Sequence, residues 1–272
     1  MRVAGDAEWK RALPLLALRN GDQLEATGAA AAVLLFSGVQ GTTTVSAANS
    51  PYVVRPLAPA PSNTRSAELI AGLSRLLAGK RKELTFASLS TRSVSERPDV
   101  LLAPRAGKLL GPPTFEWEGP DSLRYTVRVL GPQGLVWEAS GLHRAPVRYP
   151  ASAPPLVPGV RYSCEILSQN SFRQAGEFTL VPKSDAAVVH DGLTAVGRQR
   201  YPRGTAALMR AALFFEHELY AEALQELRGA AAAEHGEPAL HVMLGQLYER
   251  LGLPQLSDEE FQEAASLMGA RP

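Results

Sequence analysis

The chain has 272 residues, of which 45% are hydrophobic and 20% charged, a composition typical of folded domains rather than of disordered chains. Its 28 basic and 27 acidic residues leave a formal net charge of +1, which argues against a nucleic-acid partner because no overall positive field attracts phosphates. The single cysteine, Cys164, excludes an internal disulfide and any zinc site built from cysteines.

The apolar segments are too short to cross a bilayer. The longest run, Ala29–Phe36, is about half the length that a membrane helix needs. Within the first 20 residues, Pro14 interrupts an apolar stretch and no small-residue cleavage pattern follows it. The sequence therefore predicts neither a membrane span nor a signal peptide.

Residues 1–55 alternate between β-branched or apolar residues and turn formers, which predicts a small antiparallel meander. The predicted strands are Ala31–Phe36, Thr42–Ser46 and Tyr52–Val54, and the predicted turns are Asn20–Asp22 and Gly38–Gly41.

The order of these residues resembles a known β-domain. Gly21-Asp22-x-Leu24, then Ala32-Val33-Leu34-x-Phe36, then a glycine-containing turn and a Thr/Val strand resemble the FecR-type β-domain of bacterial envelope regulators. The resemblance implies a bacterial signalling role and favours an envelope or periplasmic setting over a cytoplasmic one. That family's sigma-factor-binding segment and membrane helix are not found in this sequence, which argues against a direct anti-sigma role.

Residues 56–110 read as a linker with short elements. Three prolines among residues 55–64 exclude a helix or central strand there. Ser66–Ala78 then has the apolar spacing of an amphipathic helix. The positive charges of Lys80–Lys82 are better explained by the carboxyl end of this helix, where the dipole favours cations, than by binding to phosphate. The predicted apolar side consists of Leu69, Ile70, Leu73, Leu76 and Leu77, and short strands are expected at Thr85–Leu89 and Val100–Leu102.

Residues 111–183 contain strand-like runs at the short, regular spacing of a β-sandwich. Alternation is clean at Tyr125, Val127 and Val129, which share one face of a strand. The predicted strands are Thr114–Glu118, Leu123–Leu130, Leu135–Ala139, Val160–Leu167 and Glu177–Val181.

Two motifs in this region resemble fibronectin type III or immunoglobulin-like domains. Leu156-x-Pro158-Gly159-x-x-Tyr162 matches the tyrosine-corner pattern, in which the Tyr hydroxyl bonds to upstream backbone. Phe115-Glu116-Trp117 looks like the inner strand whose Trp packs the core of such domains. The resemblance implies a sandwich that serves as a spacer or binding platform.

After a connector at 184–202, residues 203–272 contain an internal repeat. The shift that superposes Ala211 on Gly245 also superposes Phe214 on Tyr248, Ala223 on Ser257, Leu227 on Phe261 and Ala230 on Ala264. This offset and this alternation of small and aromatic residues resemble the tetratricopeptide repeat, so two such repeats are expected.

Helix borders are predicted from local signals. Ser257–Glu260 reads as a capping box at a helix start, and its three acidic residues cannot converge on a metal because consecutive helical positions diverge by about 100°. Gly236 and Pro238 are expected to separate the two repeats.

Two repeats are fewer than an independent solenoid usually needs, because each unit leaves part of its apolar side uncovered. The C-terminal helices are therefore expected to pack on the sandwich, on a protein or peptide partner, or on a second copy of the chain.

The sequence lacks the common catalytic motifs. No Walker loop, Gly-x-Gly-x-x-Gly, Gly-x-Ser-x-Gly or His-Glu-x-x-His occurs, and the five histidines are scattered. Cys164 lies on an inward strand face, where a buried, inert thiol is expected. A turn is expected at His190-Asp191. The sequence thus predicts no enzyme, cofactor or metal site.

The predicted fold is multidomain α+β: a small antiparallel β-domain, an immunoglobulin or fibronectin III-like sandwich and C-terminal tetratricopeptide hairpins. The predicted function is a non-catalytic protein-interaction scaffold, with Arg210, His217, His241 and Gln246 as candidate partner-binding residues. The alternative is a carbohydrate-binding accessory module that uses the sandwich face near Trp137.

Overall fold

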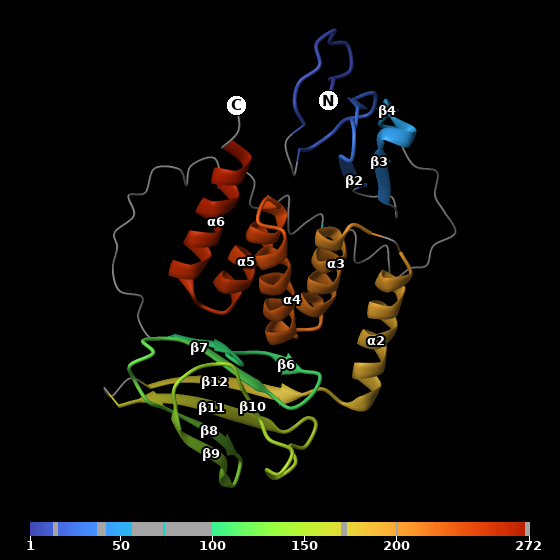
Figure 1. Cartoon of the computed structure of the whole chain (residues 1–272). Helices are drawn as coiled ribbons and strands as arrows, with labels where there is room; N and C mark the ends of the chain where they lie inside the picture. Colours follow the sequence, from blue (N-terminus) through green and yellow to red (C-terminus); the bar gives the residue numbers. More distant parts are fainter. Residues whose placement is uncertain are drawn as a thin grey trace. The chain divides into compact units, whose positions relative to one another are not determined.

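The computed structural model describes residues 1–12, 16–36, 42–55, 73, 100–169, 173–199 and 201–269. In these residues the chain is an α+β protein whose β-sheets precede five C-terminal helices (Figure 1), and none of the described sheets closes into a barrel. The predicted turn Gly38–Gly41, the basic triplet Lys80–Lys82, the strand Thr85–Leu89 and, except for Leu73, the helix Ser66–Ala78 lie outside the described residues.

The chain divides into two compact units. The first consists of Met1–Ser90, Gly192–Leu213 and Glu226–Pro272. The second consists of Thr91–Asp191 together with Phe214–Gln225. A short helical segment is thus part of the same unit as the main β-sheets.

The amino-terminal strands form two separate antiparallel pairs. The first strand pairs with the fourth, while the second and third form a hairpin, so the expected meander order is wrong. The elements are β1 Gln23–Leu24, β2 Ala31–Leu35, β3 Thr42–Ser46, the short 3-10 helix η1 Ala47–Asn49 and β4 Tyr52–Val53.

Asp22, in the turn before β1, bonds to several parts of the small β-region. Its carboxylate accepts hydrogen bonds from the backbone N–H of Arg19 at 2.8 Å and of Ala4 at 3.0 Å. These two bonds, the one from Arg19 first, lower the pKa of the carboxyl. The Asp22 carbonyl also accepts the Val54 N–H at 2.8 Å, so Asp22 joins the segments around Ala4 and Val54 to its own turn.

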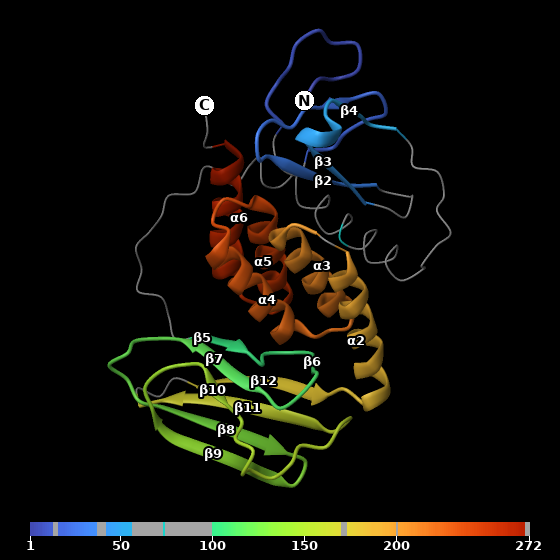
Figure 2. The same cartoon turned by 45° about the vertical axis from the view of Figure 1, so that its right-hand side comes forward.

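Two sheets of the second unit face each other (Figures 1 and 2). The three-stranded sheet has the order β10-β7-β5, and the five-stranded sheet has the order β6-β12-β11-β8-β9. All pairs are antiparallel except β6 with β12, which is parallel. The strands are β5 Val100–Ala103, β6 Lys108–Leu109, β7 Thr114–Glu118, β8 Tyr125–Gly131, β9 Gly134–Leu142, β10 Val147–Arg148, β11 Arg161–Ser168 and β12 Arg173–Leu180.

The core of this unit lies between the two sheets and follows the predicted alternation. Leu101, Phe115 and Trp117 from the smaller sheet meet residues of β8, β11 and β12. The contributions of those three strands are Tyr125, Val127, Val129, Tyr162, Cys164, Ile166, Phe178 and Leu180. Burying one apolar face of each sheet supplies the main driving force for this packing.

The segment Phe214–Gln225, which joins two helices, packs on β6 within the second unit. The Lys108 N–H donates to the Glu218 carbonyl at 2.8 Å, and the Leu110 N–H donates to Glu222 Oε1 at 2.7 Å. A Cβ at Gly107 would lie 2.3 Å from the Glu218 carbonyl oxygen, so only glycine permits this approach. The helical turn is thereby fixed to the sheet by backbone contacts.

The helices are α2 Lys183–Arg198, α3 Arg203–Glu216, α4 Tyr220–Ala233, α5 Pro238–Arg250 and α6 Pro254–Gly269. Two sequence predictions are wrong here. The turn expected at His190-Asp191, within the connector at 184–202, is instead part of helix α2. The expected capping box at Ser257 is also absent, because α6 begins earlier at Pro254 and Ser257 lies inside it, 4% exposed.

No helix in the described part of the chain combines the length and the apolar character that a membrane span requires.

Candidate interaction surface

Prolines and a carboxylate define where the C-terminal helices begin. Pro238 and Pro254 occupy the first turns of α5 and α6, where the missing N–H costs nothing because no acceptor awaits it. Glu237 caps α5, since its side chain accepts a hydrogen bond from the Ala239 N–H. The helix starts are therefore set by local sequence.

The helix bounds repeat at the offset seen in the sequence. Adding 34 to the bounds of α3, 203–216, gives 237–250, against 238–250 observed for α5. Adding 34 to the bounds of α4, 220–233, gives 254–267, against 254–269 observed for α6. The helical pair α3–α4 thus recurs as α5–α6.

Within each pair, polar and small residues join the two helices. Arg210 of α3 donates to Glu226 of α4 at 2.5 and 3.0 Å. In the second pair, His241 Nδ1 of α5 lies 2.7 Å from Glu260 Oε2 of α6. Gly245 lets α6 come so close that an added Cβ would meet the Phe261 ring at 2.5 Å. These contacts mark the side of α3 and of α5 that faces the second helix of the pair.

A different side of α3 and α5, about 100° around each helix from Gly245 of α5 and the matching Ala211 of α3, is apolar. We call it the inner face, and it consists of Thr205, Leu208 and Ala212 of α3 and, at the matching positions of the second pair, Ala239, Val242 and Gln246 of α5. Leu208 and Ala212 are 6% and 0% exposed, and Ala239 and Val242 are 4% and 0% exposed. Four of the six positions are therefore small or branched apolar residues held away from solvent.

The four residues predicted to bind a partner do not form one site. Arg210 and His241 lie between the helices of their own pairs, where they bond to Glu226 and Glu260. His217 lies in the turn between α3 and α4. Of the four, only Gln246 belongs to the inner face, and sequence reasoning missed the apolar positions beside it. The offset of the internal repeat was the signal that could have identified them.

Trp137, the predicted carbohydrate contact, packs against the core of the second unit. Its ring is stacked on the Phe115 ring at 5.6 Å between centroids and meets the Tyr149 ring edge-on at 5.3 Å. Since Phe115 is fully buried, this stacking commits one face of the indole to the interior. The arrangement does not favour a sugar-stacking platform at Trp137.

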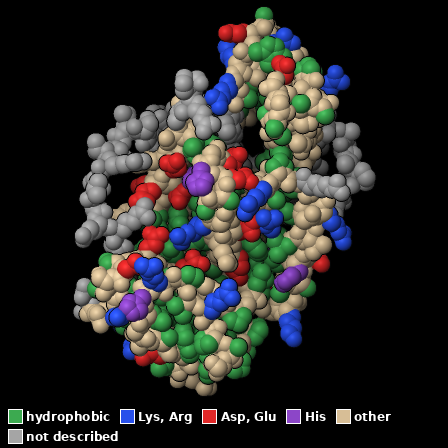
Figure 3. Space-filling view, viewed as in Figure 1, with side chains coloured by type: hydrophobic (Ala, Val, Ile, Leu, Met, Phe, Trp, Pro, Cys, Tyr) green, Lys and Arg blue, Asp and Glu red, His purple; other side chains and the backbone are tan. Residues whose placement is uncertain are grey.

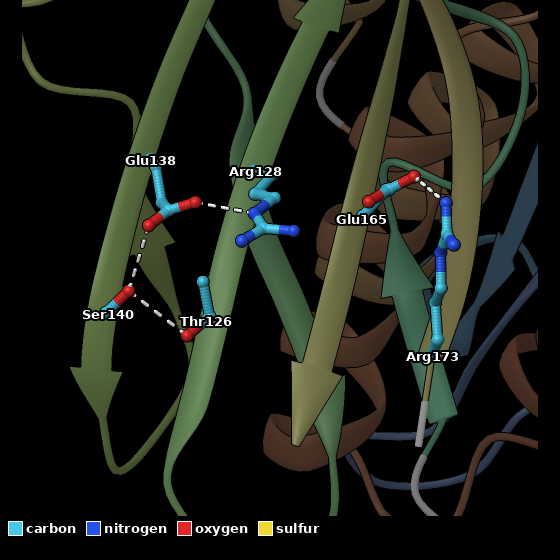
Figure 4. Close-up of polar contacts among 6 residues, drawn as sticks. All are labelled: Thr126, Arg128, Glu138, Ser140, Glu165 and Arg173. Carbon is cyan, nitrogen blue, oxygen red and sulfur yellow. Dashed lines mark hydrogen bonds and ion pairs between the residues drawn. The ribbon is translucent and has the colours of Figure 1, made fainter. Parts of the chain in front are cut away.

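The outward face of the five-stranded sheet carries a set of polar residues that satisfy one another (Figure 4). Arg128 of β8 pairs with Glu138 of β9 at 2.5 Å, and Arg173 of β12 pairs with Glu165 of β11 at 2.5 Å. Such cross-strand pairs stabilise a solvated sheet face. We assign them a structural role.

Cys164 is buried, as predicted. Its Sγ donates to the Pro104 carbonyl at 3.0 Å, and burial raises the pKa of the thiol to about 12, which disfavours the reactive thiolate. Among the described residues no group of three or more His, Cys, Asp or Glu side chains is arranged to hold a metal ion.

Charges of both signs are interspersed on the face of the molecule seen in Figure 3, in keeping with the formal net charge of +1. No protein-family model matches the chain, and no curated protein matches it at a significant level.

Proposed function

We propose that this chain is a non-catalytic protein-interaction scaffold whose inner face on α3 and α5 holds a helical segment of a partner. The observation that carries the proposal is the recurrence of the α3–α4 pair, bounds and small residues included, as the α5–α6 pair that follows it. This recurrence supports the resemblance to tetratricopeptide repeats, in which first helices line a peptide-binding surface.

The chemistry of the inner face suits an amphipathic helix. Ala212 and Ala239 are small, and Leu208 and Val242 are apolar. All four are buried within the chain, so a partner helix reaches them only when the segments that cover them move aside. A partner helix with apolar residues spaced at i, i+3, i+4 and i+7 would bury its stripe there.

The β-sheets of the second unit serve as the platform in this proposal. The Tyr162 hydroxyl accepts a hydrogen bond from the Val157 N–H at 2.9 Å, five residues upstream, in support of the resemblance to a fibronectin III or immunoglobulin-like sandwich. The FecR-type resemblance of residues 1–55 remains the basis for proposing a bacterial envelope or signalling setting.

Capture of partners by the full chain tests this function. Wild type, Gln246→Arg and Gln255→Arg would be immobilised and exposed to an extract of the source cells, with bound proteins quantified by mass spectrometry. Gln246 is a half-buried residue of the inner face, whereas Gln255 is exposed at the start of α6. We expect partners to be lost at least tenfold with Gln246→Arg and retained with Gln255→Arg.

Hydrogen exchange on the complex with one such partner then locates the contact. Added protection on α3 and α5, with a protected helical segment in the partner, is the expected result. Identical capture by all three proteins would contradict the proposal, and so would protection confined to the β-sheets.

A further inference from the structure

Strand β2 has one edge that no described residue pairs with. β2 pairs with β3 from Ala31↔Ser46 to Leu35↔Thr42, and these two strands form a sheet of their own (Figure 1). Within the described parts of the chain, no other backbone hydrogen bond involves Ala31–Leu35. The backbone N–H and C=O groups of β2 that point away from β3 can therefore bond to a further strand.

The two faces of the hairpin differ in their side chains. Val45 is buried, so the face that it shares with its cross-strand neighbour Ala32 is the inner one. On the outer face, every side chain of β3 carries a hydroxyl group, whereas every side chain of β2 is apolar. The residues of the outer face are Thr42, Thr44 and Ser46 of β3 and Ala31, Val33 and Leu35 of β2. A strand that is apolar on both faces is typical of the interior of a sheet, not of its edge.

The edge of β2 also lacks the features that keep edge strands apart. Native proteins block such edges with charges, with proline or with bulges. The sequence from Ala26 to Val54 contains no charged residue, β2 contains no proline, and its pairing with β3 shows no bulge. A ribbon of two strands is only marginally stable in water, so a third strand would stabilise this hairpin.

The order of residues in β2 matches a second copy of β2. We propose that two copies of this chain associate through β2, antiparallel and centred on Val33, so that the two hairpins form one four-stranded sheet. In this register Ala31 and Ala32 lie opposite the leucines at positions 35 and 34 of the partner copy, small against large, and Val33 lies opposite its own equivalent.

The dimer places each strand where its composition fits. β2 becomes a central strand with apolar side chains on both faces, and β3, with its threonines and serine, becomes the edge. Because β2 contains no charge, it does not repel its own copy. This inference uses a different surface from the inner face of α3 and α5 and goes beyond the proposed function.

Sedimentation equilibrium of the full chain measures the association. Wild type should form a dimer with twice the chain mass of 29.1 kDa. Val33→Lys places two like charges opposite each other at the two-fold axis and should raise the dissociation constant at least tenfold. Thr44→Lys is the matched control, because Thr44 lies opposite Val33 on the same face of the hairpin, whereas its two copies would lie about 14 Å apart, three strand spacings. A monomeric wild type, or equal weakening by the two variants, would overturn the proposal.

Disulfide trapping tests the register without adding a charge. Val33→Cys should form a covalent dimer on mild oxidation, because opposite residues of an antiparallel pair have Cβ atoms about 5 Å apart. Thr44→Cys should remain uncrosslinked, and this control also reports any disulfide formed by the buried Cys164.

Two further single-cysteine variants determine the strand direction. Ala31→Cys and Leu35→Cys should crosslink when the two proteins are mixed, whereas each alone should not, because its two copies would lie about 13 Å apart along the strand. Crosslinking of Ala31→Cys to itself, or none at position 33, would overturn the proposal. So would a monomer that crosslinks from position 33 to a different protein in an extract of the source cells, since the edge would then bind a strand of that protein.

Discussion

Asp22 is a carboxylate held almost out of solvent by backbone amides. It is 4% exposed and accepts the N–H groups of Arg19 and Ala4, so both amides would lack an acceptor without it. Its folded-state pKa lies below the ordinary value of 3.8. The stabilisation is therefore fully present above the ordinary pKa and is lost as the pH falls through the lowered one.

Asp22→Ala is expected to loosen the small β-region by about 2 kcal/mol, which corresponds to about a 30-fold faster exchange of locally protected amides. The amides to follow are those of Gln23 and Val54, which bond to Arg2 and to Asp22 itself. Asp6→Ala, at an exposed position, is the control and should leave both rates unchanged. Equal effects of the two variants would show that Asp22 is not the anchor of this region.

Glu222 differs from Asp22, because burial disfavours the ionised form of its carboxyl group. One oxygen accepts the Leu110 N–H, while the other, Oε2, is buried and has no hydrogen-bond partner among the residues that the structure describes. Desolvation is the main reason that its pKa is raised above the ordinary 4.5, although the bond from Leu110 opposes the shift. A raised pKa contributes stability below pH 4.5 that is lost as the pH rises through the folded-state value.

Glu222→Gln should therefore make the second unit more stable than wild type at neutral pH, because the amide keeps an acceptor for Leu110 without a buried charge. The difference should shrink and vanish as the pH is lowered to 4. Urea unfolding followed from pH 4 to pH 8 measures it. Glu177→Gln, whose side chain is 67% exposed in the same unit, should show no such pH dependence. A constant difference at every pH would contradict the assignment to burial.

At the scale of single residues, the sequence indicated the buried positions better than the functional ones. Cys164 and Trp117 were predicted to be inside and are 0% and 6% exposed, because strand alternation fixes which face a residue occupies. Arg210 and His241 looked like surface residues of first helices. Their acidic partners, Glu226 and Glu260, come from neighbouring helices, and nothing local in the sequence reveals such a pairing.

At the scale of elements, the bounds of strands with clean alternation of apolar and polar residues were predicted closely. Elements that depend on tertiary contacts were not predicted. β7 and β3 have the predicted bounds, whereas the two-residue strands β6 and β10 have no periodicity to detect. Helix α2 was missed although Val189 and Val196, which precede Ala223 and Ala230 by the same offset as the repeat, already carry its pattern. Both are buried at 1% and 3%, so the offset was a usable signal.

The close approach of α5 and α6 depends on Gly245. Alanine there would gain about 1 kcal/mol of helix propensity but place a Cβ within 3.0 Å of three Phe261 ring atoms. Since overpacking costs about 1–3 kcal/mol and the propensity gain offsets part of this, Gly245→Ala is expected to destabilise the pair by up to about 2 kcal/mol. Gly229→Ala in α4 meets no atom within 4 Å and should instead stabilise by about 0.5–1 kcal/mol. Chemical denaturation distinguishes the opposite signs, and a stabilising Gly245→Ala would refute the close packing.

At the scale of the whole molecule, each compact unit is built from segments that are separated in the sequence. Phe214–Gln225 belongs with the β-sheets, while the residues on either side of it belong to the first unit. The sequence predicted that the helices need a further surface to pack on, and β6 provides one for this segment. Backbone contacts of Gly107 and Lys108 set the position of Phe214–Gln225. Such contacts cannot be predicted from the pattern of side chains in the sequence.

Gly107 and Gly134 allow this attachment to be tested with a matched pair. Both have positive φ, 95° and 109°, so alanine strains the backbone equally, by about 1–2 kcal/mol. Only at Gly107 does the new Cβ also collide with the Glu218 carbonyl and the Tyr220 ring, which would force apart the hydrogen bonds to Glu218 and Glu222. Gly107→Ala should therefore destabilise the second unit by about 3 kcal/mol or more and expose the Lys108 and Leu110 amides to exchange, whereas Gly134→Ala should leave those amides protected. If both variants lost the same stability and kept both amides protected, the attachment of Phe214–Gln225 to β6 would contribute nothing to the fold.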